Sequence, residues 1–234
     1  MSDPGSTEVL ITGATSGIGQ GIARGFADAG MQVLAVGVGA LPDMEENITY
    51  AELDVRDAAA VSELIDPLSG LSTVLNAAGI IRRGDELEPD VFQQVVDVNL
   101  NGTMRVCAAA RSHLAANGGS IINIASMLSY FGGGLVPGYA ASKGGIAQLT
   151  KSLAIAWASE GIRVNALAPG WIATPLTTDL QADPNRAAPI LDRTPMARWG
   201  RPKDLVGPAL FLASPAAGFV TGTILNVDGG YAAM

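Results

Sequence analysis

The chain is 234 residues long, which suits one α/β domain and is too short for two full-sized ones. Hydrophobic residues make up 48% of the sequence and charged residues 15%, a balance typical of a chain with a large buried core. Fourteen basic residues against 22 acidic ones give a net charge of −8, which argues against nucleic acid or an anionic membrane as a partner. The one cysteine, Cys107, excludes an internal disulfide and a multi-cysteine zinc site.

Several other function classes are excluded by missing signals. The sequence has no GxSxG or HExxH motif, so serine hydrolases and zinc peptidases of these types are excluded, and we expect no metal site. The one histidine, His113, lies near the end of an expected helix, where a solvated imidazole is the more usual role. Residues 1–4 lack a secretion signal, and no apolar run reaches the about 18 residues of a membrane helix. We therefore expect a cytoplasmic protein that acts on a small molecule.

Short β-branched runs alternate with helical patterns along the whole chain. Strands are predicted at 8–12, 32–36, 48–53, 72–76, 120–124, 162–167 and 224–227. Helices are predicted from the turn after the first strand to about residue 29, then at 57–65, 90–96, 100–116, 139–159 and 202–213. Strands that are apolar on both faces and alternate with helices predict an α/β fold, a doubly wound parallel sheet of about seven strands with helices on both faces.

The sequence shows no internal repeat and no linker, so residues 1–234 are predicted to form a single domain. The segment 169–200 is rich in proline and shows no periodicity. It is too long for an ordinary connection, so we expect residues 170–200 to form a functional or mobile loop next to the substrate.

Glycines mark the exit from the first strand, where residues 12–19 read TGATSGIG. Glycine allows a tight turn there and lets a pyrophosphate approach the N-terminus of the following helix, whose free N–H groups attract anions. A plain strand-to-helix turn is the alternative interpretation of these glycines. The position in the first βα unit favours a dinucleotide site, because doubly wound sheets bind ligands at the carboxyl ends of their strands.

Further motifs follow in order: NAAG at 76–79, NLNG at 99–102, a serine at 126, YAASK at 139–143 and PGWIAT at 169–174. With the glycine turn, they make residues 8–230 resemble the single-domain branch of the short-chain dehydrogenase/reductase family. The resemblance implies a Rossmann-type fold and a nicotinamide-dependent oxidoreductase that interconverts a secondary alcohol and a ketone. Its implied catalytic residues are Asn99, Ser126, Tyr139 and Lys143.

The resemblance also implies a set of cofactor contacts. They are Gly13, Thr15, Ser16, Gly17, Ile18, Gly19, Gly37, Asp54, Val55, Asn76, Ala77, Gly79, Tyr139, Lys143, Pro169, Gly170, Ile172 and Thr174. Ala77 stands where the family usually has an asparagine. The connection between the second and third strands is too short for the helix that the family usually places there, so we expect an open rim on the adenine side.

Tyr139 and Lys143 lie four residues apart and so share one face of a helix. A free phenol has a pKa near 10, so a phenol that exchanges protons at neutral pH needs about 4 kcal/mol of phenolate stabilisation. We expect the Lys143 ammonium and the oxidised nicotinamide to supply it, with Ser126 orienting the substrate oxygen. The resemblance implies that Asn99 supports a water relay from the lysine to solvent.

The sequence favours NAD over NADP. A 2′-phosphate is usually met by arginine or lysine, yet no basic residue lies between Gly30 and Arg56, and Thr15 and Ser16 are uncharged. The usual acidic acceptor for a free 2′-hydroxyl is also missing, because Gly37 stands at the end of the second strand. NADP therefore stays open as the alternative.

The stretches 80–83, 127–134 and 191–200 resemble the sugar-acid branch of the family. They predict substrate contacts from Arg82, Arg83, Arg198 and Tyr130, with solvated surface arginines as the alternative. A reductase of carrier-bound 3-oxoacyl chains and a non-catalytic NAD(H)-binding module are the other functions considered. The resemblance further implies a homotetramer in which helices 100–116 and 139–159 pack against their copies.

Overall fold

The computed structural model describes residues 8–234, so the expectation about residues 1–4 falls outside it. Seven strands form one parallel sheet in the order β3-β2-β1-β4-β5-β6-β7. The strands are β1 (Val9–Thr12), β2 (Val33–Gly37), β3 (Ile48–Glu52), β4 (Thr73–Asn76), β5 (Ser120–Ile124), β6 (Arg163–Pro169) and β7 (Ile224–Val227). The predicted doubly wound α/β fold is confirmed.

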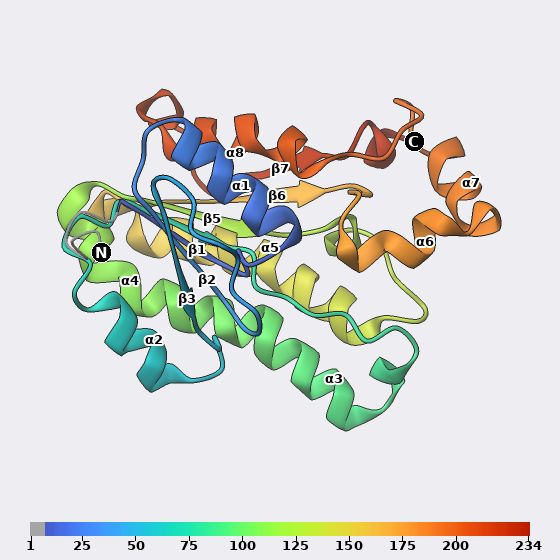
Figure 1. Cartoon of the computed structure of the whole chain (residues 1–234), viewed down its shortest axis with the longest axis horizontal. Coiled ribbons are helices and arrows are strands. Elements are labelled where there is room, and N and C mark those ends of the chain that lie inside the picture. The colour runs from blue at the N-terminus through green and yellow to red at the C-terminus, as the bar shows by residue number, and fades with distance from the viewer. Residues whose placement is uncertain (1–7) are drawn as a thin grey trace.

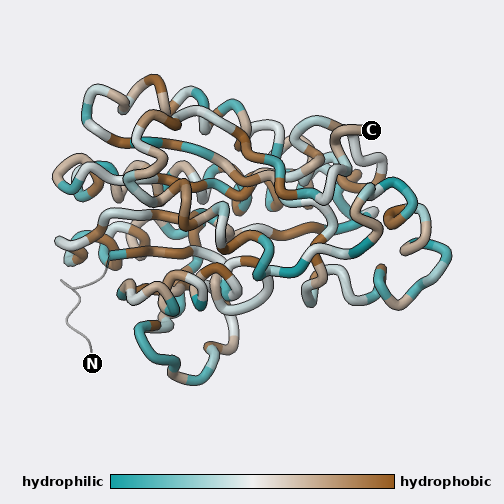
Figure 2. The backbone as a smooth tube through the Cα atoms, turned by 90° about the horizontal axis from the view of Figure 1, so that it is seen from above, coloured by the Kyte–Doolittle hydropathy of each residue, from teal (hydrophilic) through white to brown (hydrophobic). Residues whose placement is uncertain are grey.

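Helices cover both faces of the sheet (Figure 1). One face packs against α1 (Gly17–Asp28) and α8 (Val206–Ala213), and the other against α2 (Ala58–Ile65), α4 (Thr103–Asn117) and α5 (Pro137–Trp157). The helix α3 (Pro89–Val96) packs beside α5. Figure 2 shows the apolar segments running along the strands in the middle of the molecule.

The side chains of β1 point alternately to the two faces of the sheet, and both faces are buried. Val9 and Ile11 belong to the core cluster under α1 and α8, whereas Leu10 belongs to the cluster under α2, α4 and α5. None of the three side chains is exposed to solvent. Burial of one such side chain contributes about 1.5–3 kcal/mol, so a strand with apolar residues on both faces is held in the middle of the molecule.

The strand order reverses between β1 and β4, which opens a crevice at the carboxyl ends of these strands. Four of the motifs lie at the carboxyl ends of strands: the glycine turn follows β1, NAAG overlaps the end of β4, Ser126 follows β5 and PGWIAT overlaps the end of β6. Because all strands are parallel, the motifs meet at one edge of the sheet.

Two segments differ from the prediction. The segment 169–200 contains two short helices, α6 (Thr178–Ala182) and α7 (Pro184–Asp192), at one end of the molecule (Figure 1). Pro184 stands in the first turn of α7 and Pro189 lies inside it, which hides the helical pattern. Residues 97–102 form a π-helix that joins α3 to α4, so the helix predicted to begin at 100 continues from α3.

The connection between β2 and β3, residues 38–47, contains no helix, as predicted. Within residues 8–234, no helix combines the length and the apolar character needed to cross a bilayer.

Candidate active site

The bend between β1 and α1 leaves no space for a side chain at Gly13 or Gly19. Gly13 has a φ of +63°, and a Cβ added there would lie 2.5 Å from the backbone nitrogen of Ala78. A Cβ added at Gly19 would lie 2.3 Å from the carbonyl oxygen of Gly13. The side chain of Ser16, which precedes α1, makes no capping hydrogen bond. The close backbone and the uncapped N–H groups of α1 fit the pyrophosphate of a dinucleotide.

The adenine end of the crevice is built around Gly37 at the end of β2. A Cβ at Gly37 would lie 2.8 Å from Thr15 Oγ1. The Thr15 side chain thus lies close to the place where an acidic side chain at position 37 would begin. Val55 is buried, so its side chain faces the core and its backbone is the part left to contact a ligand.

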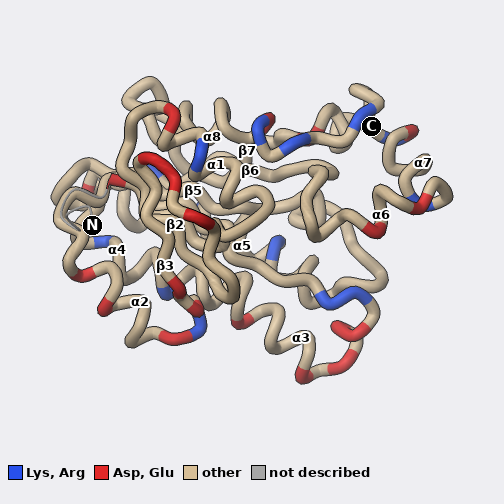
Figure 3. The backbone as a smooth tube through the Cα atoms, in the orientation of Figure 1, with Lys and Arg blue, Asp and Glu red and all other residues tan. Residues whose placement is uncertain are grey.

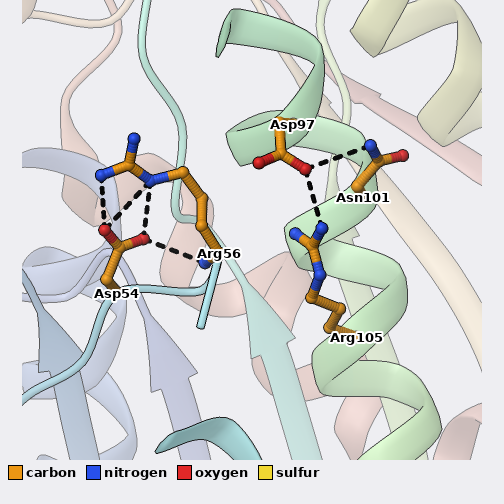
Figure 4. A network of polar contacts seen from close by, with 5 residues as sticks. All are labelled: Asp54, Arg56, Asp97, Asn101 and Arg105. Carbon is orange, nitrogen blue, oxygen red and sulfur yellow. Dashed lines mark hydrogen bonds and ion pairs between the residues drawn. The ribbon is translucent and has the colours of Figure 1, made fainter. Parts of the chain in front are cut away.

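Asp54 is engaged by a neighbouring cation. The Arg56 guanidinium hydrogen-bonds its carboxylate, with Nη2 to Oδ2 at 2.6 Å, and the backbone N–H of Arg56 also donates to it (Figure 4). These bonds hold the pKa of Asp54 below its usual value. In the same view Asp97 binds Asn101 and Arg105 (Figure 4). The predicted adenine contact therefore has its carboxylate tied to Arg56.

The side chain of Asn76 points into the core and away from the predicted cofactor site. Its Nδ2 donates to Asn123 Oδ1 at 2.9 Å and contacts Cys107 Sγ at 3.3 Å, and Asn123 in turn donates to Thr150. Among the described residues, no group hydrogen-bonds Asn76 Oδ1. Because the Asn76 amide nitrogen is bonded in the core, its backbone is left for the predicted cofactor contact, which stays a prediction. The neighbouring Ala77 lies against the Gly13 bend.

Ser126, Tyr139 and Lys143 meet beyond the end of β5. Tyr139 lies in the first turn of α5, which begins two residues earlier than predicted, and Ser126 precedes a 3₁₀ turn at Met127–Ser129. Lys143 Nζ lies 5.6 Å from the centre of the Tyr139 ring and donates to the carbonyl oxygen of Ile124 at 2.6 Å. The two side chains share one face of α5, as their spacing predicts.

Burial controls the ionisation of this pair. Burial raises the pKa of the Tyr139 phenol, and the hydrogen bond with Ser126 opposes that rise. Burial also lowers the pKa of the Lys143 ammonium to about 8. The sequence predicts a lowered pKa for the Tyr139 phenol with the cofactor bound. In the chain itself, the rise in this pKa caused by desolvation is larger than the lowering caused by the hydrogen bond with Ser126.

Asn99 lies on the π-helix and is fully buried. Its Oδ1 accepts from the backbone N–H of Ile80 at 2.8 Å, and its Nδ2 donates to the Ile80 carbonyl at 3.0 Å and to Ser142 Oγ at 3.1 Å. A Cβ at Gly79 would lie 3.4 Å from Asn99 Oδ1 and 3.8 Å from Lys143 Nζ. Asn99 thus links the turn after β4 to α5, close to the lysine.

A buried carboxylate, Glu86, holds the start of α5. One oxygen accepts from the backbone N–H of Tyr139 at 2.7 Å and the other from that of Arg82 at 2.7 Å. The residue is 1% exposed. An anion at a helix N-terminus is favourable, so Glu86 fixes the backbone that carries the phenol.

We expect Glu86→Gln to lower the free energy of unfolding by about 2 kcal/mol. The NH₂ group of the new side chain would point at a backbone N–H, so two donors would face each other without an acceptor. The kcat should fall as well, because Tyr139 loses its anchor. Urea denaturation measures the first effect. The matched variant Glu88→Gln, at an exposed residue, should stay within about 0.5 kcal/mol of the parent. Equal stability of the two variants would contradict the anchoring role.

A cavity of about 730 Å³ opens beside these residues. Ser126 and Tyr139 line it, together with Ile18 from α1. The residues contributed by the segment 169–200 are Pro169, Gly170, Trp171, Ile172, Thr174, Leu176, Thr177, Asp179, Leu180, Arg186 and Arg193. The glycines at 132–134 form part of the opposite wall. The cavity therefore joins the predicted catalytic residues to the predicted loop.

Of the four predicted substrate contacts, one lines this cavity, namely Arg83. Arg82 is exposed and does not line it. Arg198 pairs with Asp204 at 2.7 Å and lines a separate cavity of about 350 Å³. Tyr130 donates its hydroxyl to Asn226 and lies outside the large cavity.

Sequence analysis missed Arg186 and Arg193 as lining residues. They lie seven residues apart, at the spacing of two helical turns, and a recognised helix at 184–192 would have placed them on one face. The signal was available, because Asp183 is a typical N-cap before Pro184 and its carboxylate accepts from the backbone N–H of Asn185. Figure 3 shows a basic segment in the loop before α3.

Comparisons with known proteins agree with this geometry. Residues 13–232 match the family model described as enoyl-(acyl carrier protein) reductase. The chain is 41% identical to 2-dehydro-3-deoxy-D-gluconate 5-dehydrogenase of Escherichia coli (strain K12), over 96% of this chain and 94% of that protein. It is also 41% identical to galactitol 2-dehydrogenase (L-tagatose-forming) of Cereibacter sphaeroides, over 94% and 93% of the two chains.

Solved structures give the same result. The gluconate 5-dehydrogenase of Burkholderia cenocepacia J2315, in complex with NADP and tartrate, is 36% identical with a TM-score of 0.88, over 97% of this chain and 96% of that one. A protein of Agrobacterium tumefaciens, provisionally named a 2-deoxy-D-gluconate 3-dehydrogenase and solved with bound NADP, is 41% identical over the whole of both chains with a TM-score of 0.90. With its parallel sheet, its glycine bend and its tyrosine–lysine pair, the chain belongs to the short-chain dehydrogenase/reductase family.

Proposed function

We propose that this chain is a cytoplasmic, NAD(H)-dependent dehydrogenase that interconverts a secondary alcohol and a ketone on a deoxy-keto sugar acid. One observation carries the proposal: Ser126 and Tyr139 line the same cavity as Arg83, Arg186 and Arg193. A group that moves a proton thus lies in one space with cations suited to a carboxylate. The names of the sugar-acid relatives support the same substrate class.

In the proposed mechanism, Tyr139 takes the proton of the substrate hydroxyl during oxidation and returns it during reduction. Ser126 holds the same oxygen in place, and the Lys143 cation stabilises the phenolate form of Tyr139. Asn99 positions the groups around Lys143 through which protons reach solvent. The nicotinamide, when bound, supplies or accepts the hydride.

We also propose that residues 170–200 form the substrate loop of a single domain spanning 1–234. The loop contributes residues from α6 and α7 to the cavity, including Leu180 and Arg186. Two short helices joined at Asp183 can move as a unit over a bound substrate.

A substrate panel tests the proposal. Oxidation is assayed with NAD in three separate reactions, with 2-dehydro-3-deoxy-D-gluconate, D-gluconate and galactitol as substrates. Reduction of a 3-oxoacyl thioester is assayed with NADH. We expect the highest kcat/KM with a sugar acid. Highest activity on the thioester would identify a reductase of acyl chains instead. NADH binding without turnover of any compound would indicate a non-catalytic module.

The structure around Gly37 supports NAD. The loop at 38–47 carries Asp43, Glu45 and Glu46 and no basic residue, so it would repel a 2′-phosphate. Two arginines that flank the loop in sequence are paired with carboxylates: Arg24 binds Glu45 at 2.8 Å, and Arg56 binds Asp54.

We therefore expect NADH to bind at least about tenfold more tightly than NADPH, a difference of about 1.4 kcal/mol. Fluorescence titration measures both dissociation constants. Val38 is exposed and follows β2 directly, so Val38→Arg should narrow the difference by strengthening NADPH binding. Tighter binding of NADPH by the unchanged protein would overturn the preference, and the NADP-bound relatives make this a sharp test.

We propose that the protein is a homotetramer whose contacts include α4 and α5. Met104 on α4 and Ile155 on α5 are 37% and 82% exposed, and small residues such as Ala108 and Ala156 lie exposed beside them. Such faces suit close helix packing between copies. Light scattering at micromolar concentration should give four times the mass of one chain. A monomer would refute the proposal.

A further inference from the structure

Arg193 is held between two aromatic rings at the wall of the large cavity. Its guanidinium carbon lies 4.9 Å from the centre of the Phe131 ring and 4.3 Å from the centre of the Tyr231 ring. Its Nη1 donates to the Tyr231 hydroxyl at 3.2 Å. The two rings meet edge to face with their centres 6.4 Å apart. A long flexible side chain is thereby held in one place before any ligand arrives.

These three residues come from distant parts of the chain. Phe131 follows the 3₁₀ turn after β5, Arg193 directly follows α7, and Tyr231 lies in the last residues of the sequence. All three line the cavity that Ser126 and Tyr139 also line. The fold thus brings a positioned guanidinium into the space where the alcohol would react.

Arg193 forms no ion pair with a carboxylate of the described residues. Within residues 8–234, the ion pairs of arginines join Arg24, Arg56, Arg105, Arg111 and Arg198 to carboxylates, and Arg193 is not among them. It is half-buried, so its charge is only partly hydrated. A planar guanidinium in such a place is suited to bind a carboxylate through two parallel hydrogen bonds.

The other two arginines of the cavity differ from Arg193 in exposure. Arg83 and Arg186 are both exposed, so water screens their charges. The cavity lining holds these three cations and one carboxylate, Asp179, in a protein whose net charge is −8. The cavity lining therefore carries a local excess of positive charge.

We propose that Arg193, held by Phe131 and Tyr231, binds the carboxylate of the substrate and sets the preference for sugar acids over neutral polyols. The assignment rests on the proposed function and adds to it the residue that selects the substrate class. A polyol leaves the half-buried cation without a partner, whereas a carboxylate pairs with it. Discrimination therefore comes from both the new bonds and the unpaired charge.

A matched pair of substrates tests the assignment. D-Gluconate and D-glucitol differ by a carboxylate in place of a primary alcohol, and both are assayed with NAD. We expect Arg193→Met to lower kcat/KM for gluconate about 100-fold, mainly through KM, and to change that for glucitol less than about threefold. Arg193→Lys keeps the charge without the planar fork, so we expect a loss of about tenfold. The control Lys203→Met removes an exposed charge and should leave both substrates unchanged.

Each outcome has one meaning. If Arg193→Met keeps the gluconate-to-glucitol ratio of the parent, the assignment of Arg193 is wrong and the sugar-acid function stands. If the parent itself does not prefer gluconate to glucitol, the proposed substrate class fails and the assignment fails with it. NADH binding by each variant reports folding, and if Arg193→Met does not fold, the ratio for Arg193→Lys decides.

Discussion

Tyr139→Phe should lower kcat by a factor of about 10³ to 10⁴ and leave the dissociation constant of NADH within about twofold. The substitution removes the hydroxyl that exchanges a proton with the substrate and keeps the ring that fills the start of α5. The phenol is hydrogen-bonded with Ser126 at the wall of the cavity, and the phenyl ring left by the substitution offers no group there that exchanges a proton. Steady-state kinetics and fluorescence titration measure the two quantities.

A matched control separates chemistry from packing. Tyr50 on β3 donates its hydroxyl to Glu45 and does not line the cavity, so Tyr50→Phe makes the same chemical change elsewhere. It should leave kcat unchanged within about twofold. If Tyr139→Phe keeps substantial activity, Tyr139 is not the acid and base, and the proposed mechanism is wrong.

Local sequence patterns were sufficient to predict the fold and the end of the sheet at which the motifs gather. The glycine turn, the YAASK spacing and the PGWIAT segment each belong to one strand end and the residues that follow it, and parallel strands bring such ends together. The spacing of Tyr139 and Lys143 is a property of one helix and needs no tertiary information. The catalytic roles of these residues stay predictions.

Side-chain directions across the fold were less predictable. The turn motif placed Asn76 at the crevice, yet a residue at a strand end can point to either face, and Asn76 turns toward Asn123 and Cys107. Among the arginines, the resemblance of residues 191–200 to the sugar-acid branch favoured Arg198, but Arg198 pairs with the Asp204 carboxylate, six residues further on.

The limit of prediction from local sequence patterns is clearest at Arg193. Its role depends on Phe131, 62 residues earlier, and on Tyr231, 38 residues later, and no local pattern links the three. The phenol pKa is a similar case, because the depth of burial that raises the pKa of Tyr139 is set by the whole cavity wall. The proposed substrate preference and the pKa of Tyr139 thus depend on residues far apart in the sequence. The spacing of Tyr139 and Lys143 depends on one helix alone.

Lys143→Met should lower kcat for alcohol oxidation about 100-fold at neutral pH and move the rising limb of the pH profile to more alkaline pH. A unit charge 5.6 Å from the ring, at an effective dielectric constant of about 20, is worth about 3 kcal/mol, or about two pH units. Loss of the cation raises the pKa of Tyr139, so the phenolate that accepts the proton forms only at higher pH.

The lysine's own titration sharpens this test. Burial holds the pKa of Lys143 at about 8, so its positive charge is present below that pH and is lost above it. The rate ratio of the parent to Lys143→Met should therefore be largest below about pH 8 and become smaller above it. Lys151→Met, at an exposed position on the same helix, should show the parent profile at every pH. A ratio that stays constant across pH 6 to 10 would mean that Lys143 acts through packing, because a charge effect has to disappear with the charge.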